Sequence, residues 1–334
     1  MVSAVIFVAT SCVSPLTGFA FWETNLAYEG ESIYNYLQVK NLSDRTILST
    51  NVLFGVQSVT MKDKGLTGMY YDTALAAPAL ADNANSALIL GMGTGTYARQ
   101  LKQYYPKMNI TGVEIDQKIT DLAGEYFDEP ADIPVTTYDG RAWLAASHDK
   151  YDMIMVDAYQ DITIPFQMSS TEFFTMVREH LNPGGVMVVN MNMISDGQGS
   201  INEALSDTIA SVFGNGNTLT ADVPNTTNRE LFAKKPGSGS EENSMQQASK
   251  AFNLRETTYE RTGSEDLEWY MEEVASRFRK VNEPDSASTI LTDDKAPVEV
   301  LGMHAIDQII ADEAGPYRQI LKDEGFGGLL RAVQ

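Results

Sequence analysis

The sequence is poor in cysteine, histidine and basic residues, and each shortage excludes a class of protein. A single cysteine, Cys12, permits neither a disulfide framework within the chain nor a cysteine-rich zinc site. The three histidines never stand three or four residues apart, so we expect no histidine metal centre. Lysine and arginine number 24 against 45 aspartates and glutamates, a formal net charge of −21. Such a field repels nucleic-acid backbones and favours cationic ligands.

The remaining composition is that of an ordinary globular protein. Hydrophobic residues make up 43% of the chain and charged residues 21%, which excludes disordered, collagen-like and coiled-coil classes. A length of 334 residues is about twice that of a typical single domain. One large α/β domain with a small appended domain fits this length better than several equal domains.

Residues 4–22 form a charge-free stretch that is just long enough to cross a bilayer as a helix. No basic residue precedes it, which disfavours a cleaved signal peptide. Several polar residues and Pro15 dilute its apolar character, so a buried helix is the alternative to a membrane-associated one.

The residue pattern along the chain then changes twice, and each change predicts a different kind of structure. Residues 28–60 are rich in aromatic and β-branched residues around a polar turn, which predicts a small antiparallel sheet. Residues 70–80 read as a helix with a boundary or bend at Pro78. From residue 86 onward, short apolar strands alternate with helices, which predicts a parallel sheet covered on both faces. The expected strands are 87–90, 110–115, 134–138, 151–156, 186–190 and 225–233, and the expected helices are 97–105, 117–127, 171–181 and 267–281.

These changes suggest a division into an apolar segment (1–23), a β-sheet domain with a linking helix (24–80) and a large α/β domain (81–334). Residues 237–243 read as a flexible linker inside the large domain.

The first strand of the α/β region runs into three alternating glycines, Gly91, Gly93 and Gly95, and then a helix. Glycines at such a turn let the backbone bend sharply and let a ligand approach without interference from a Cβ atom. Ligands of open parallel sheets bind beyond the carboxyl ends of the strands, where this turn falls. A tight turn with a purely structural role is the alternative.

Acidic residues end the next strand. Glu114 lies 19 residues after Gly95, close to the spacing of about 20 that is typical of an acid binding ribose hydroxyls. A carboxylate can accept hydrogen bonds from both hydroxyls. Asp116 is assigned instead to the cap of the helix that begins at Gln117.

The third and fourth strands also end in acids. Asp139, followed by Gly140, is placed to accept a hydrogen bond from an adenine amine, and Asp157 ends the fourth strand. No lysine or arginine stands in the glycine turn, which disfavours the phosphates of NAD(P) or ATP. The pattern favours an adenosine that carries a cationic group, such as a sulfonium.

With these residues in view, residues 28–234 resemble the spermidine synthase (polyamine aminopropyltransferase) family, which has a class I methyltransferase-like Rossmann fold. The resemblance rests on the glycine turn with Arg99 after it, and on Glu114, Asp139 and Asp157. It implies a ribose-binding role for Glu114, an adenine-binding role for Asp139, and a place for Asp157 at the start of the catalytic loop.

Further matches lie on either side. Asn35 and Gln57 resemble family residues that face the nucleoside, and Tyr71 resembles the tyrosine before the active-site helix. Residues 291–299 resemble a segment typical of the membrane-fused branch of the family, which would make residues 4–22 its last membrane helix.

Three departures from the family pattern bear on the choice of substrate. Thr94 replaces the aspartate that contacts the aminopropyl amine of decarboxylated S-adenosylmethionine. Asp72 and Thr73 replace the residues that usually follow the active-site tyrosine. In the catalytic loop, Asp161 is offset by one position from its counterpart.

We interpret the chain as an aminopropyltransferase that uses decarboxylated S-adenosylmethionine as co-substrate, without a tightly bound cofactor, and a diamine such as putrescine as acceptor. In this hypothesis Asp157 accepts the proton of the attacking amine and Tyr71 orients its nitrogen. Asp161 and Asp72 hold the distal ammonium, or else serve as a loop carboxylate and a helix cap. The nucleoside is held by Asn35, Gln57, Gly91, Gly93, Thr94, Gly95, Glu114, Asp139 and Gly140.

Two alternatives remain open. Thr94 makes an S-adenosylmethionine-dependent methyltransferase credible, because without an acid there the methionine carboxylate is not repelled. The altered catalytic loop leaves a non-catalytic nucleoside-binding domain as the third reading. The resemblance further implies a homodimer, and a protein that is membrane-associated with a cytoplasmic catalytic domain, or cytoplasmic.

Overall fold

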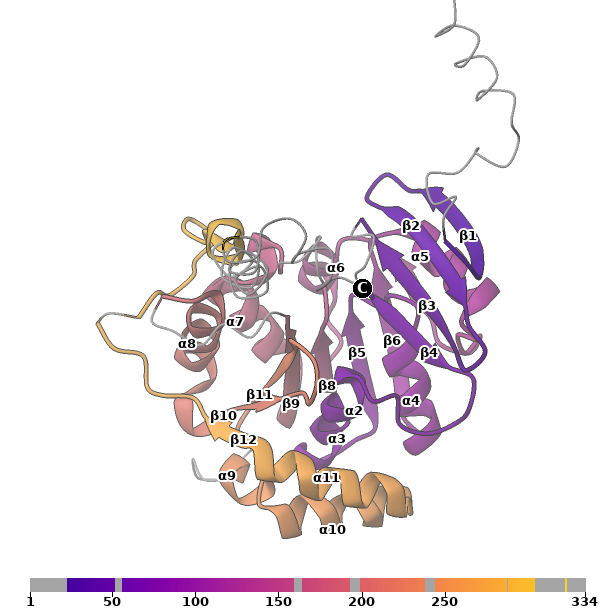
Figure 1. Cartoon of the computed structure of the whole chain (residues 1–334). Coiled ribbons are helices and arrows are strands. Elements are labelled where there is room, and N and C mark those ends of the chain that lie inside the picture. The colour runs from indigo at the N-terminus through magenta and orange to yellow at the C-terminus, as the bar shows by residue number, and fades with distance from the viewer. Residues whose placement is uncertain are drawn as a thin grey trace, which may run out of the picture.

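Two β-sheets organise the chain, as Figure 1 shows in a computed structural model. The structure describes residues 23–51, 56–158, 164–192, 199–237, 244–286, 288–303 and 322. The predicted apolar segment 4–22, Asp161 and residues 238–243 of the predicted linker lie outside the described residues. Within the described ranges, none of the helices combines the length and the hydrophobicity that crossing a bilayer requires.

The N-terminal sheet is antiparallel, as predicted. Its four strands follow one another in space as they do in sequence. They are β1 (Leu26–Glu31), β2 (Tyr36–Asn41), β3 (Arg45–Thr50) and β4 (Ser58–Met61). Its apolar face packs through Leu37, Val39 and Leu48 against α5 (Gln117–Tyr126) of the larger part of the molecule. This contact fixes the small sheet beside the first turns of the large one.

The large sheet has eight strands in the order β12-β10-β11-β9-β8-β5-β6-β7. Strands β5 to β9 are mutually parallel, and β10, β11 and β12 extend the sheet with antiparallel pairs. The predicted fold class, a Rossmann-like and mostly parallel sheet with a small antiparallel sheet before it, is therefore confirmed. The strands are β5 (Ser86–Leu90), β6 (Asn109–Glu114), β7 (Val135–Thr137), β8 (Tyr151–Val156), β9 (Leu181–Met191), β10 (Thr218–Asp222), β11 (Arg229–Lys234) and β12 (Phe278–Lys280).

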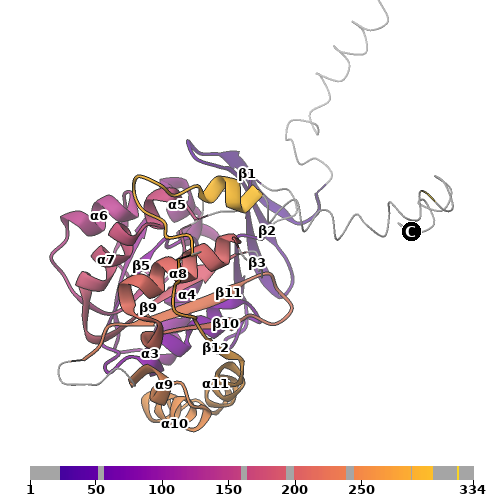
Figure 2. The same cartoon turned by 90° about the vertical axis from the view of Figure 1, so that its left-hand side faces the viewer.

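Helices cover both faces of the large sheet (Figures 1 and 2). One apolar core joins the sheet to α2 (Tyr70–Ala74), α3 (Ala76–Leu80), α4 (Thr96–Tyr104), α10 (Ala251–Thr262) and α11 (Glu265–Arg277). The core on the opposite face joins it to α6 (Gly140–Ala146), α7 (Thr171–His180) and α8 (Ile201–Phe213). In both views α10 and α11 lie side by side at the bottom, with the short α9 (Ser244–Ala248) near them. A sheet buried on both faces explains the continuous apolar runs of its central strands.

Several predicted boundaries were wrong, two of them in helices. The helix expected over 70–80 breaks at Leu75, between α2 and α3, and not at Pro78. Pro78 falls in the first turn of α3, where the missing N–H has no helical partner to lose. The helix expected over 267–281 ends at Arg277, and the next three residues form β12. They pair with β10, so strand pairing prevails there over the helical pattern.

Candidate active site

A cavity of about 390 Å³ opens where β5, β6 and β8 end, between the large sheet and the N-terminal sheet. Its wall includes predicted residues from both sheets and from the glycine turn. Those residues are Asn35, Gln57, Tyr71, Gly91, Gly93, Glu114, Asp139, Gly140 and Asp157. The tertiary fold therefore brings together nine side chains or backbone positions that are spread over more than a third of the sequence.

The glycine turn approaches the end of β8 very closely. Gly91 has φ +88°, and a Cβ atom there would lie 2.4 Å from the carbonyl oxygen of Asp157. Gly93 and Gly95 also adopt positive φ values, 55° and 78°, and Gly95 is the N-cap of α4. Only glycine allows both the left-handed backbone and this contact at position 91.

Glu114 holds the turn from the neighbouring strand. Its carboxylate accepts hydrogen bonds from the backbone N–H of Gly93, at 2.8 Å, and of Asp116, at 3.0 Å. Burial raises the pKa of Glu114, while these backbone hydrogen bonds act in the opposite direction. Each carboxylate oxygen keeps acceptor capacity beyond the single bond it makes here, so the group can still accept ligand hydroxyls.

Asp116 caps α5, as the sequence indicated, by accepting a hydrogen bond from the backbone of Lys118. The same side chain accepts hydrogen bonds from Ser32, at 2.5 Å, and from the Asn35 amide, at 3.1 Å. It therefore ties the N-terminal sheet to the large sheet. Asn35 lines the cavity while its side chain is oriented by this bond.

Asp139 caps α6, and Gly140 begins that helix. One oxygen of Asp139 accepts a hydrogen bond from Ala142 N–H at 2.7 Å, and the residue is only partly buried at the cavity wall. Ile115 and Tyr138, which are 41% and 56% exposed, stand in the same wall. Exposed apolar side chains beside a carboxylate suit a flat, partly polar ring.

The carboxylate of Asp157, in the wall of the cavity, receives two hydrogen bonds. The Tyr70 hydroxyl donates to one carboxylate oxygen at 2.6 Å, and the Asn190 amide donates to the other at 2.9 Å. Burial raises the pKa of Asp157 to about 7, and these two hydrogen bonds only partly oppose the rise. A carboxyl group that titrates near neutral pH suits proton transfer.

Three predicted residues lie differently from expectation. Tyr71 lines the cavity, but its hydroxyl lies 3.2 Å from Ser58 Oγ, and the neighbouring Tyr70 contacts Asp157 instead. Thr94 is buried and donates to Ser58, and Gly95 supports the turn from behind, so neither lines the cavity. The turn buries the side chain at position 94, because its glycines fix the backbone direction.

Asp72 serves the structure and not the cavity. It is buried and accepts hydrogen bonds from Thr67 (backbone and hydroxyl), from the Gly68 backbone and from the Gln100 amide. Asp72 lies in the first turn of α2, whose N-cap is Met69, and these donors from the preceding turn and from α4 satisfy its carboxylate, so its contacts are structural.

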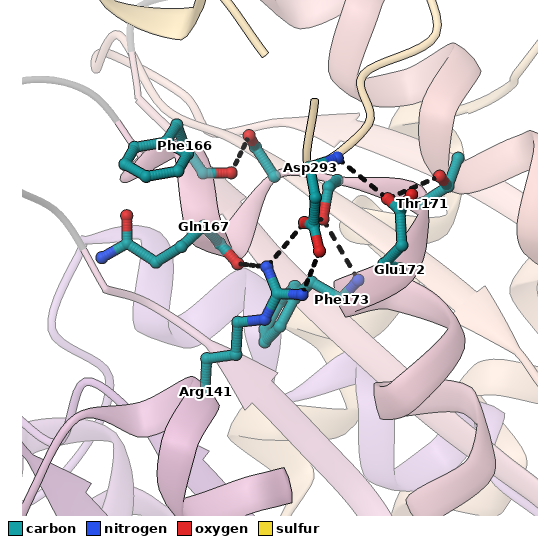
Figure 3. Close-up of polar contacts among 9 residues, drawn as sticks. Arg141, Phe166, Gln167, Thr171, Glu172, Phe173 and Asp293 are labelled. Atoms are coloured by element: carbon teal, nitrogen blue, oxygen red, sulfur yellow. Dashed lines mark hydrogen bonds and ion pairs between the residues drawn. The ribbon is translucent and has the colours of Figure 1, made fainter. Parts of the chain in front are cut away.

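A segment near the C-terminus holds another wall of the cavity (Figure 3). Arg141 makes a two-pronged ion pair with Asp293, at 2.7 and 2.6 Å, and also donates to the Gln167 carbonyl at 2.7 Å. Ser170 donates to the same carboxylate at 2.5 Å. Gln167 lines the cavity, so residues 291–299 now have a structural role: they brace this wall.

Sequence reasoning missed Tyr70 and Asn190. Asn190 ends β9 beside Asp157, so the strand-end rule that found the acids would also have found this amide. Tyr70 carried no comparable signal, because two consecutive tyrosines begin the same short helix.

The fold is Rossmann-like, and the cavity at its strand ends is lined by the glycine turn, by Glu114 and by the buried carboxylate of Asp157. The family model of the spermine/spermidine synthase domain matches residues 69–235. A curated relative from Bifidobacterium longum strain NCC 2705, named a probable polyamine aminopropyl transferase, is 99% identical over 334 residues; the match covers 100% of this chain and 75% of the relative. The chain belongs to the spermine/spermidine synthase family.

Solved structures share the fold. A probable spermidine synthase from Corynebacterium glutamicum ATCC 13032 superposes with a TM-score of 0.55 at 20% identity, covering 80% of this chain and 99% of that chain. A spermidine synthase in complex with the transition state analogue AdoDATO gives a TM-score of 0.53 at 18% identity, covering 64% of this chain and 75% of that one.

Proposed function

We propose that the chain transfers the aminopropyl group of decarboxylated S-adenosylmethionine to a diamine such as putrescine and releases methylthioadenosine. One observation carries this proposal: a buried carboxylate, Asp157, accepts hydrogen bonds from two side chains in the wall of a cavity that is also lined by a glycine turn held by Glu114. Family membership agrees with it.

The nucleoside end supplies hydrogen-bond acceptors and apolar surface. In this proposal Glu114 accepts the ribose hydroxyls, and Asp139 accepts the adenine amine with the oxygen that does not cap α6; the spare acceptor capacity of both carboxylates supports this. Gly91 and Gly93 let the sugar approach the backbone. Negative groups at both ends of the cavity favour a cationic sulfonium over a phosphate.

The transfer needs a neutral amine and a proton acceptor. The lone pair of the acceptor nitrogen forms a bond to the propyl carbon as the carbon–sulfur bond breaks. The electron pair of the broken bond stays on sulfur, and the sulfonium becomes a neutral thioether. Asp157 takes the proton that the nitrogen loses, because burial keeps its pKa near neutral pH. Alignment of amine and sulfonium in one cavity supplies the rest of the rate enhancement.

Tyr70 and Asn190 are assigned to hold Asp157 in place, each by one hydrogen bond. Tyr71, whose ring centroid lies 4.0 Å from that of Tyr70, stays the proposed contact for the reacting nitrogen. Asp161 stays a proposed catalytic-loop acid and lies outside the described residues.

The test is to incubate the protein with putrescine and either decarboxylated or ordinary S-adenosylmethionine, and to identify the nucleoside product. The proposal expects methylthioadenosine from the decarboxylated compound. S-adenosylhomocysteine from ordinary S-adenosylmethionine would establish a methyltransferase instead. Binding of methylthioadenosine without any turnover would support a non-catalytic domain.

We also propose, from the sequence, membrane association through residues 4–22 and a homodimer. Fractionation of cells that express the chain with and without residues 4–22 tests the first. Light scattering of the purified protein tests the second, and a monomer mass would exclude it.

A further inference from the structure

Glu230 is a buried carboxylate that accepts no hydrogen bond from any of the residues that the structure describes. It lies in β11, is 0% exposed, and both of its carboxylate oxygens lack a hydrogen-bond partner in the part of the chain that is described. Buried ionised groups without a partner are costly, so native proteins retain them only in neutral form or with a cation nearby. Burial, together with the charge of Asp157, raises the pKa of Glu230 well above its ordinary value.

The position of Glu230 relates it to the candidate active site. Asn190, which donates to Asp157, is the direct cross-strand partner of Glu230 between β9 and β11. Phe232, two residues further along β11, packs in the core on the α2 and α3 side, so Glu230 points to that same face. Asp157, Asn190 and Glu230 therefore form a row across three adjacent strands, at the edge of the sheet where the cavity opens.

The distance between the two carboxyl groups at the ends of this row suits a short diamine. Two strand spacings separate the backbones of Asp157 and Glu230, about 10 Å, and the two side chains shorten this gap. A short linear diamine with one nitrogen at Asp157 would extend its other nitrogen toward Glu230. Tyr97 lines the cavity, and its phenol pKa is raised first by burial and then by the charge of Glu230.

We propose that Glu230 is a specificity-determining residue that selects acceptors with a second, positively charged nitrogen. This inference rests on the proposed function. The ammonium of a bound diamine favours the ionised form of Glu230, and the attraction then acts through the low-dielectric interior without direct contact, since Glu230 does not line the cavity. Asp72, one of the two acids that the sequence suggested for this role, already accepts four hydrogen bonds within the fold, and the other, Asp161, lies outside the described residues.

The test compares two amines with the same four-carbon chain: putrescine, with two nitrogens, and n-butylamine, with one. Their dissociation constants are measured by calorimetry with the full chain saturated with methylthioadenosine. For Glu230→Gln we expect putrescine to bind about 10-fold more weakly or worse, while n-butylamine changes by less than about twofold. Asp207→Asn, a buried acid on α8 at the opposite face, is the matched control.

Equal changes for the two amines, or none, would overturn the proposal. Glu230→Met adds an independent measurement: because the carboxylate has no partner to lose, the melting temperature should stay the same or rise. A large fall would mean that Glu230 has a structural role. Turnover of the unmodified protein with putrescine tests the proposed function separately. If there were no turnover, the proposed function would fail, but the comparison of binding constants could still be interpreted.

Discussion

The two ends of the cavity are built by different means. At the nucleoside end, each acid also shapes the backbone: Glu114 holds the glycine turn, and Asp139 caps α6. At the amine end, Asp157 is held by side chains, Tyr70 from α2 and Asn190 from β9. The end that we assign to the nucleoside is therefore fixed by hydrogen bonds from backbone N–H groups to acids, whereas the end that we assign to the amine depends on how the side chains of distant elements pack. Substitutions at the two ends should accordingly separate binding of the nucleoside from turnover.

The largest effect is expected from Asp157→Asn, which keeps the shape of the side chain but removes the proton acceptor. We predict that kcat falls about 100- to 10,000-fold, while the dissociation constant of methylthioadenosine changes little. Timed product assays measure kcat, and calorimetry measures the dissociation constant of methylthioadenosine. The control is Asp152→Asn, a buried acid at the other end of the same strand, which should affect stability and not kcat. Unchanged turnover of Asp157→Asn would remove the assignment.

The pH dependence of turnover tests the same carboxyl group without mutation. Asp157 can accept a proton only when ionised, and burial raises its pKa to about 7. At saturating amine, kcat should therefore fall about tenfold for each pH unit below that value. The affinity for methylthioadenosine, measured at the same pH values, separates loss of the proton acceptor from loss of binding. A flat profile between pH 5 and pH 8 would contradict the assignment.

Glu114→Gln probes the nucleoside end. A neutral amide cannot give the charge-assisted hydrogen bonds that we assign to the ribose hydroxyls, so methylthioadenosine should bind about 10- to 100-fold more weakly. At saturating nucleoside, kcat should change far less. Glu129→Gln provides a matched control, because Glu129 lies close behind the glycine turn but does not line the cavity. Equal effects of the two substitutions would argue against the ribose contact.

The smallest effect is expected at the wall that Asp293 braces. Asp293→Asn removes the two-pronged ion pair with Arg141, which is partly exposed. We predict a weakening of methylthioadenosine binding by about three- to tenfold, with kcat nearly unchanged. The control is Asp132→Asn, which breaks an exposed ion pair with Lys102 far from this wall. If both variants bind equally well, the C-terminal segment does not support the cavity.

The sequence predicted the parts of the site that depend on single elements. The strand at 151–156 was located correctly because all six of its residues are buried between two helical layers, and residues 153–156 form a continuous apolar run. Gly91, Glu114 and Asp157 were found because the ends of parallel strands meet at one edge. The strand β9, by contrast, begins at Leu181 and not at 186, because Asn182 to Gly185 resemble a turn yet continue the strand with an irregular register.

Sequence alone determined the acidic strand ends, the glycine turn and the absence of phosphate-binding basic residues there, since each is encoded within a few neighbouring residues. The tertiary structure decided that Tyr70 and not Tyr71 contacts Asp157, and that Glu230 joins the row beside it. Consecutive helical residues point about 100° apart, so the packing of α2 against the sheet selects the tyrosine. The partner of a strand residue is likewise set by pairing with a distant strand, which no local pattern records.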